Sequence, residues 1–135
     1  MTPVIDLRVR FAVEDATLSE LHHRVFGSGS SDLLPWAQRL ERHSLTWVGA
    51  FDGETLIGFV HLCWDGGSHA FVLDTAVHPD HQRRGIGAAL VHTAAREAAR
   101  AGCEWLHVDY EPHLRAFYQD SCGFRPTAAG LFHLT

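Results

Sequence analysis

The sequence predicts one α/β domain, residues 1–135, in which a central mixed sheet is flanked by helices. Two observations carry this prediction. A chain of 135 residues suits a single hydrophobic core. Its apolar residues alternate in some segments and follow helical spacing in others, in the order β, α, α, β, β, β, α, β, α, β.

The first half of the chain predicts strands and helices separated by turn residues. Alternating apolar and polar residues indicate the first strand, and Gly27 marks the end of the helix that follows. The dipeptide Asp52-Gly53 between two apolar runs is typical of a hairpin. The predicted elements are a strand over 4–12, helices over 14–27 and 32–42, a loop over 27–31, and strands over 45–52 and 55–64.

The second half continues with the same two periodicities. Gly102 and Gly123 stand where two helices are expected to end, and Pro112 stands near the start of the second of them. The predicted elements are a strand over 70–77, a helix over 84–101, a strand over 104–110, a short helix within 111–124, and a final strand in the tail, 127–135.

Composition narrows the class of protein. The formal net charge of -5 argues against general nucleic-acid binding and favours a cationic substrate. No apolar run is long enough to span a membrane, and Asp6 and Arg8 interrupt the segment where a signal peptide would need its apolar core. Three cysteines without paired spacing fit a reducing compartment, so we expect a cytoplasmic protein.

The turn before the third predicted helix, in the stretch AVHPDHQRRGIGAALV (76–91), carries the chemistry. Gly85 and Gly87 let a ligand approach the backbone closely, and Arg83 and Arg84 add positive charge at a helix N-terminus. Such a site favours an anion, and phosphate above all.

Several known kinds of phosphate and metal site are excluded at this turn, because their sequence motifs are absent. No Lys-Ser/Thr pair follows Gly87, so the Walker pattern is absent, and Leu90 breaks the dinucleotide pattern GxGxxG. His78 and His81 lack the partners that a zinc site would need. The prediction is therefore a phosphate site that uses no metal.

The same stretch resembles the acetyl-CoA motif of the Gcn5-related N-acetyltransferases, Gln/Arg-x-x-Gly-x-Gly/Ala, here residues 82–87. Val77 and Pro79 match the preceding V-x-P of the family, and LHVDYEPHLRAFYQDSCGF (106–124) resembles its second segment. Five positions separate Tyr118 from Gly123, against four in many members, which predicts a different end to this helix. The resemblance implies the acyl-CoA N-acyltransferase fold, with a mostly antiparallel sheet whose strands part at the CoA site.

By this resemblance, acetyl-CoA is the co-substrate. Its pantetheine arm would lie in the gap between the parted strands, along Ala76 and Val77, and Phe117 would flank the thioester. The backbone of the turn would hold the pyrophosphate; those residues are Gln82, Arg83, Arg84, Gly85, Ile86, Gly87 and Ala88.

Acetyl transfer to an amine needs an acid for the leaving thiolate and a route for the proton of the amine. Tyr118 stands where the family commonly has an acidic tyrosine, although it could simply pack. Asp74 is a carboxylate within an apolar strand, which needs a cationic substrate or a structural partner, and a water molecule is the other candidate base. His61 and Trp64 are candidates for the acceptor pocket, although a tryptophan such as Trp64 is more often simply a core residue.

The resulting prediction is direct transfer of an acetyl group from acetyl-CoA to a primary amine, which we expect to belong to a small molecule, within a complex of both substrates. Two alternatives stay open: a CoA-binding regulatory module without turnover, and transfer to a protein N-terminus or lysine. The resemblance also implies that a homodimer is possible, since dimers are frequent in the family.

Overall fold

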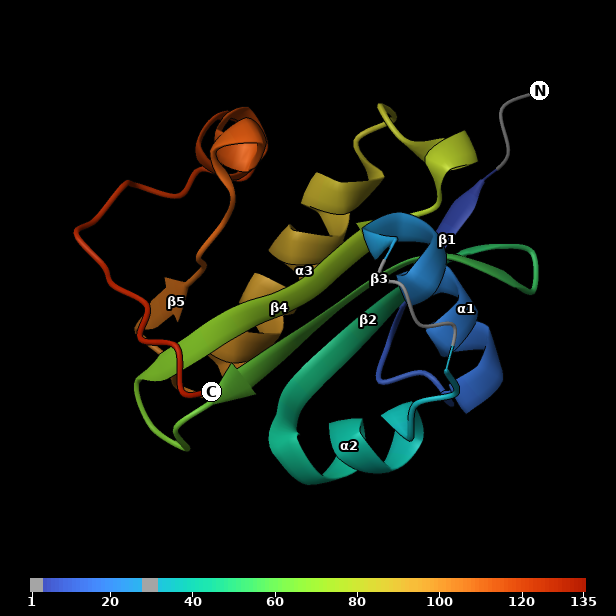
Figure 1. Cartoon of the computed structure of the whole chain (residues 1–135), viewed down its shortest axis with the longest axis horizontal. Helices are drawn as coiled ribbons and strands as arrows, with labels where there is room; N and C mark the ends of the chain where they lie inside the picture. Colours follow the sequence, from blue (N-terminus) through green and yellow to red (C-terminus); the bar gives the residue numbers. More distant parts are fainter. Residues whose placement is uncertain (1–3, 28–31) are drawn as a thin grey trace.

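A five-stranded sheet separates the helices into two layers in the computed structural model, which describes residues 4–27 and 32–135 (Figure 1). Helices α1 (Asp15–Phe26) and α2 (Trp36–His43) cover one face of the sheet, and α3 (Ile86–Arg100) covers the other. The strands, in spatial order, are β1 (Ile5–Val9), β2 (Ser44–Asp52), β3 (Thr55–Trp64), β4 (His69–Val77) and β5 (Trp105–His107). All pairs are antiparallel except β4 with β5, so the predicted mixed, mostly antiparallel sheet is confirmed.

Two apolar clusters, one on each face, hold the layers together. Under α3, the fully buried Leu90 packs with Val60 and Val72 of the sheet. Under α1 and α2, Trp36 and Phe59 are equally buried and meet edge to face. Burying a side chain of this size stabilises the fold by about 1.5–3 kcal/mol, so these clusters fix which face of the sheet each helix covers.

Several predicted boundaries shift for local reasons. The first strand stops at Val9, because Arg10 has a left-handed φ of 53°. The strand predicted over 104–110 keeps only Trp105–His107. The predicted final strand in 127–135 is wrong: this tail pairs with no other described strand, and its apolar Phe132 is 88% exposed. Apart from Gly27, the loop predicted over 27–31 lies outside the described residues.

The helix that carries Tyr118 is a π-helix, η3 (Ala116–Ser121), preceded by a 3-10 turn, η2 (Pro112–Leu114). The N–H of Cys122 donates to the carbonyl of Phe117 at 2.9 Å, an i→i+5 hydrogen bond. A π-turn holds one residue more than an α-turn. The helix therefore ends in a π-turn and not in an α-turn, which agrees with the different helix end predicted from the five positions between Tyr118 and Gly123.

Strands β4 and β5 part soon after they meet. Their pairing runs only from His69 opposite Trp105 to Phe71 opposite His107. Beyond this point the chain leads away from β4 to η3, as Figure 1 shows at the upper left. Among the described residues, no strand pairs with this edge of β4 from residue 72 onward. No helix within the described ranges is both long and apolar enough to cross a membrane.

Candidate active site

The turn between β4 and α3 is tightly folded. A 3-10 turn, η1 (Pro79–His81), leads into it, and the side-chain Nε2 of Gln82 donates back to the carbonyl of Val77 at 3.0 Å. Arg83 and Gly85 both have left-handed φ values, 65° and 77°. The first hydrogen bond within α3 runs from the N–H of Ala89 to the carbonyl of Gly85. The N–H groups that precede Ala89 in the first turn therefore have no acceptor inside the helix.

Positive charge gathers at this helix N-terminus. The side chains of Arg83 and Arg84 are exposed, and neither forms an ion pair with another residue in the described part of the chain. The helix dipole and its free N–H groups add to the same potential. This combination of charge and donors can bind an anionic group such as a phosphate.

Gly87 brings η3 against the first turn of α3. A Cβ built on Gly87 would lie 2.9 Å from Cε1 of Phe117 and 3.7 Å from a methyl carbon of Val77. The first of these distances is shorter than real Cβ contacts allow. The glycine is thus required by the packing of Phe117, and it places three of the predicted site residues side by side.

A cavity of about 400 Å³ opens along the unpaired edge of β4. Phe26, Leu73 and Asp74 line it on the side of α1, while Thr75 and Tyr118 line it on the side of α3. Both sides of the strand edge therefore open into one space. Two ligands approaching from opposite faces of the sheet can meet there.

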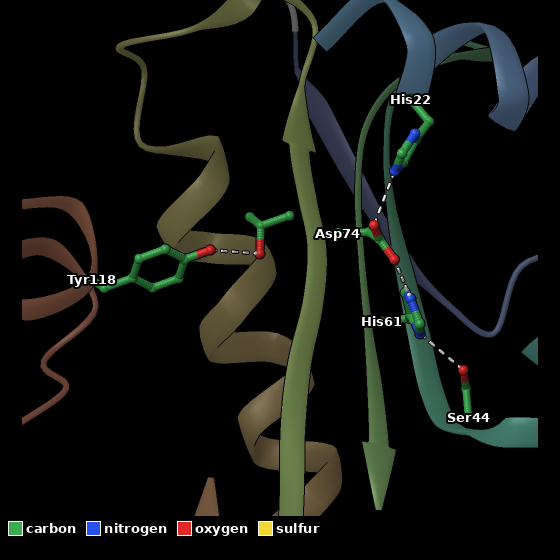
Figure 2. A network of polar contacts seen from close by, with 6 residues as sticks. His22, Ser44, His61, Asp74 and Tyr118 are labelled. Atoms are coloured by element: carbon green, nitrogen blue, oxygen red, sulfur yellow. Dashed lines mark hydrogen bonds and ion pairs between the residues drawn. The ribbon is translucent and has the colours of Figure 1, made fainter. Parts of the chain in front are cut away.

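Tyr118 reaches this cavity from η3 and is only 7% exposed. Its hydroxyl donates to Oγ1 of Thr75 at 3.2 Å (Figure 2). Its ring stacks on Tyr110 with 5.1 Å between centroids. Burial raises the pKa of Tyr118, against the opposing effect of the hydrogen bond to Thr75. The hydroxyl is therefore protonated at neutral pH and can give its proton to a stronger base.

Asp74 lies in a β-bulge that turns its side chain toward α1. The register of β3 with β4 shifts between Phe59 and His61, and Asp74 has a left-handed φ of 57°. Val72, two residues earlier, packs under α3, whereas Asp74 bonds to side chains on the α1 side. Such a φ is uncommon for aspartate, so the surrounding contacts must hold it.

Those contacts come from two histidines. Oδ2 of Asp74 accepts from Nε2 of His61 at 2.7 Å, and Oδ1 accepts from Nε2 of His22 at 2.9 Å. Nδ1 of His61 lies 3.0 Å from the hydroxyl of Ser44, which completes a chain of four side chains (Figure 2). Burial alone raises the pKa of Asp74, but the two histidine hydrogen bonds outweigh it and hold that pKa well below its usual value.

The remaining predicted residues fall in different places. Ala76 and Ile86 are buried, so only their backbone atoms can face a ligand, and Ala88 is half-buried in the first turn of α3. Trp64 is 37% exposed at the end of β3 and does not line the cavity. No group of three or more His, Cys, Asp or Glu side chains in 4–27 and 32–135 is arranged to hold a metal ion.

Sequence reasoning missed His22. The sequence does contain a signal for it: His22 follows Leu18 by one helical turn and so shares the buried face of α1. A polar side chain on a buried face needs a partner. That partner, Asp74, is 52 positions away, so only the fold identifies it.

Comparison with known sequences identifies a family. The family model described as "Acetyltransferase (GNAT) family" matches residues 15–124. Mycothiol acetyltransferase from Mycolicibacterium vanbaalenii is 33% identical over 105 residues, which are 78% of this chain and 33% of that protein. The chain thus spans about a third of the length of the curated mycothiol acetyltransferases that it matches.

Solved structures share the fold. A GNAT family acetyltransferase from Streptococcus pneumoniae TIGR4 superposes with a TM-score of 0.79 at 23% identity, covering 98% of both chains. The aminoglycoside N-acetyltransferase AAC(6')-Iy in complex with CoA gives 0.80 at 18% identity, covering 100% of this chain and 97% of that one. The predicted acyltransferase fold is confirmed.

Proposed function

The chain belongs to the acetyltransferase (GNAT) family, and we propose that it moves an acetyl group from acetyl-CoA to a primary amine of a small molecule. The transfer is direct, within a complex that holds both substrates. The observation that carries this proposal is the cavity at the edge of β4, which is lined by Tyr118 on one face of the sheet and by Asp74 on the other.

The residues present fit the chemical groups of acetyl-CoA. The turn from Gln82 to Ala88 offers N–H donors and two exposed arginines for the pyrophosphate. The edge of β4 beside Val77, which no described strand covers, offers backbone hydrogen bonds to an extended amide chain, although the carbonyl of Val77 already accepts from the side chain of Gln82. Phe117 lies beside this end of β4, close to Gly87.

The two faces of β4 divide the chemistry. Tyr118, on the α3 side, is a buried hydroxyl that can protonate the departing thiolate. Asp74, on the α1 side, faces the position from which an amine would approach. An attacking amine and a leaving thiolate occupy opposite sides of the reacting carbonyl carbon, which is the arrangement this site offers.

The lining of the cavity supports a cationic acceptor. Asp74, Asp109 and Glu111 contribute carboxylates, and none of its described lining residues is basic. The names of the similar proteins, aminoglycoside and mycothiol acetyltransferases, are consistent with a small amine-bearing acceptor. A homodimer stays a prediction.

Calorimetric titration with acetyl-CoA tests the first half of the proposal. We expect the wild type to bind in the micromolar range, and the variant Arg83→Ala/Arg84→Ala to bind at least about tenfold more weakly, which is about 1.4 kcal/mol. Arg96→Ala removes an exposed arginine further along α3 and is the matched control. No binding by the wild type, or equal binding by the double variant, would contradict the proposal.

Release of free thiol from acetyl-CoA tests the second half. The acceptors are 1,4-diaminobutane, glucosamine and a lysine-containing peptide, with a blank lacking amine. We expect either small amine to raise the rate above the blank. A rate raised by the peptide alone would identify a protein lysine as the acceptor, and binding without any turnover would indicate a regulatory module.

A further inference from the structure

The four-residue chain from Ser44 through His61 and Asp74 to His22 is more elaborate than substrate binding requires. Its members come from β2, β3, β4 and α1, so the fold brings four separate elements together to build it (Figure 2). A carboxylate flanked by imidazoles is an arrangement that can hold and orient a proton acceptor.

The two histidines differ in how many ring nitrogens are already hydrogen-bonded within the protein. His61 is 2% exposed and uses both ring nitrogens inside the protein, one toward Asp74 and one toward Ser44. His22 uses only Nε2, and its Nδ1 makes no hydrogen bond to any described residue. Its side chain is 21% exposed. His22 is therefore the member of the chain whose second ring nitrogen is not engaged by another described residue.

The position of His22 matches that role. It is held between aromatic rings, with centroids 4.5 Å from Phe26 and 5.2 Å from Trp36. Phe26 and Asp74, which His22 contacts, both line the cavity, although His22 itself is not among the lining residues. His22 thus stands on the α1 side of β4, across the strand from Tyr118 (Figure 2).

We propose that His22 accepts the proton that the amine loses, with Asp74 as its positioning residue; this inference rests on the proposed acetyl transfer. The amine nitrogen forms a bond to the carbonyl carbon of the thioester as its proton passes to Nδ1 of His22, directly or through one water molecule. The bond from carbon to sulfur breaks, and the thiolate takes the proton of the Tyr118 hydroxyl. His22 then releases its proton to solvent, from which Tyr118 regains one.

The groups around His22 favour this proton transfer. The carboxylate of Asp74 on β4 stabilises the imidazolium that forms. Behind the carboxylate lies His61 on β3, which orients it. From α2 the neighbour is the ring of Trp36, with the guanidinium of Arg39 4.9 Å over that ring. Asp74 already accepts two hydrogen bonds, so it is a poor base by itself but a good positioning residue.

The test compares His22→Gln with wild type in the thiol-release assay, using the faster small amine of the panel above. The amide nitrogen of glutamine can still donate to Asp74, but the titratable ring is lost. We expect kcat/KM to fall by about 10²-fold or more, as for the loss of a general base. We also expect the acidic limb of the wild-type pH profile to disappear, while the Kd of acetyl-CoA stays the same. His43→Gln, at the exposed end of α2, is the matched control.

Two results would overturn the proposal for His22. One is a variant within fivefold of wild type that keeps the acidic limb. The other comes from the wild type alone and needs no folded variant: the midpoint of the acidic limb should move with temperature as an imidazole does, and a midpoint that barely moves points to a carboxylate. A wild type that neither binds acetyl-CoA nor releases thiol would instead refute the proposed function itself.

Discussion

Replacing Tyr118 by phenylalanine separates the chemical role of its hydroxyl from its packing role. The ring keeps its stack on Tyr110 and its edge contact with Phe117, 5.1 and 4.8 Å between centroids. The variant loses one neutral hydrogen bond, to Thr75 at 3.2 Å, which contributes about 1 kcal/mol to stability. Loss of a general acid costs about 10²–10⁴-fold in rate, or about 3–5 kcal/mol in the barrier.

The assay is thiol release at saturating acetyl-CoA, with urea unfolding of the same samples. We expect Tyr118→Phe to lower kcat by at least about 10²-fold and the free energy of unfolding by only about 1 kcal/mol. The chain has one other tyrosine, and Tyr110→Phe removes a hydroxyl that accepts from Gln119 at 2.7 Å. A kcat of Tyr118→Phe within fivefold of wild type, or an equal loss in both variants, would refute the acid role.

Two predictions concern stability. Gly87→Ala should lower the free energy of unfolding, measured in urea, by about 1–3 kcal/mol, because the added Cβ would lie 2.9 Å from the ring of Phe117. Adding Phe117→Leu should recover part of that loss. If it recovers none, the clash with Phe117 is not the cause. Asp74 has a lowered pKa in the folded state, so its contribution is present above about pH 4, the value of a free aspartate, and is lost as pH falls further. The Tm advantage of wild type over Asp74→Asn should therefore shrink between pH 5 and pH 2, and an advantage that grows on acidification would contradict the sign.

The elements that the sequence predicts well are those governed by local periodicity. The four-residue spacing of Ile86, Leu90, Ala94 and Ala98 is a property of neighbours on one helix, and all four are buried on the sheet. The Asp52-Gly53 hairpin depends on the turn alone, and Gly53 has the expected left-handed φ of 61°. The positively charged turn belongs to the same class, since strand, turn and helix follow one another directly.

The parts that the sequence could not predict depend on distant partners. Alternation cannot reveal that Asp74 adopts a left-handed φ, because that conformation is held by His22 and His61 from other elements. Likewise, the apolar residues of the tail predict a strand, but a strand forms only where a sheet edge pairs with it. Among the described strands, none pairs with 127–135.

The π-turn in η3 has a consequence for how this chain should be compared with others. Its extra residue sits inside a helix that holds Tyr118, between Phe117 and Cys122, and not in a loop. A homologue one residue shorter here must carry its gap in the middle of that helix. An alignment that moves the gap into the neighbouring loops would pair Tyr118 with the wrong position, and would report the tyrosine as lost in proteins that have it.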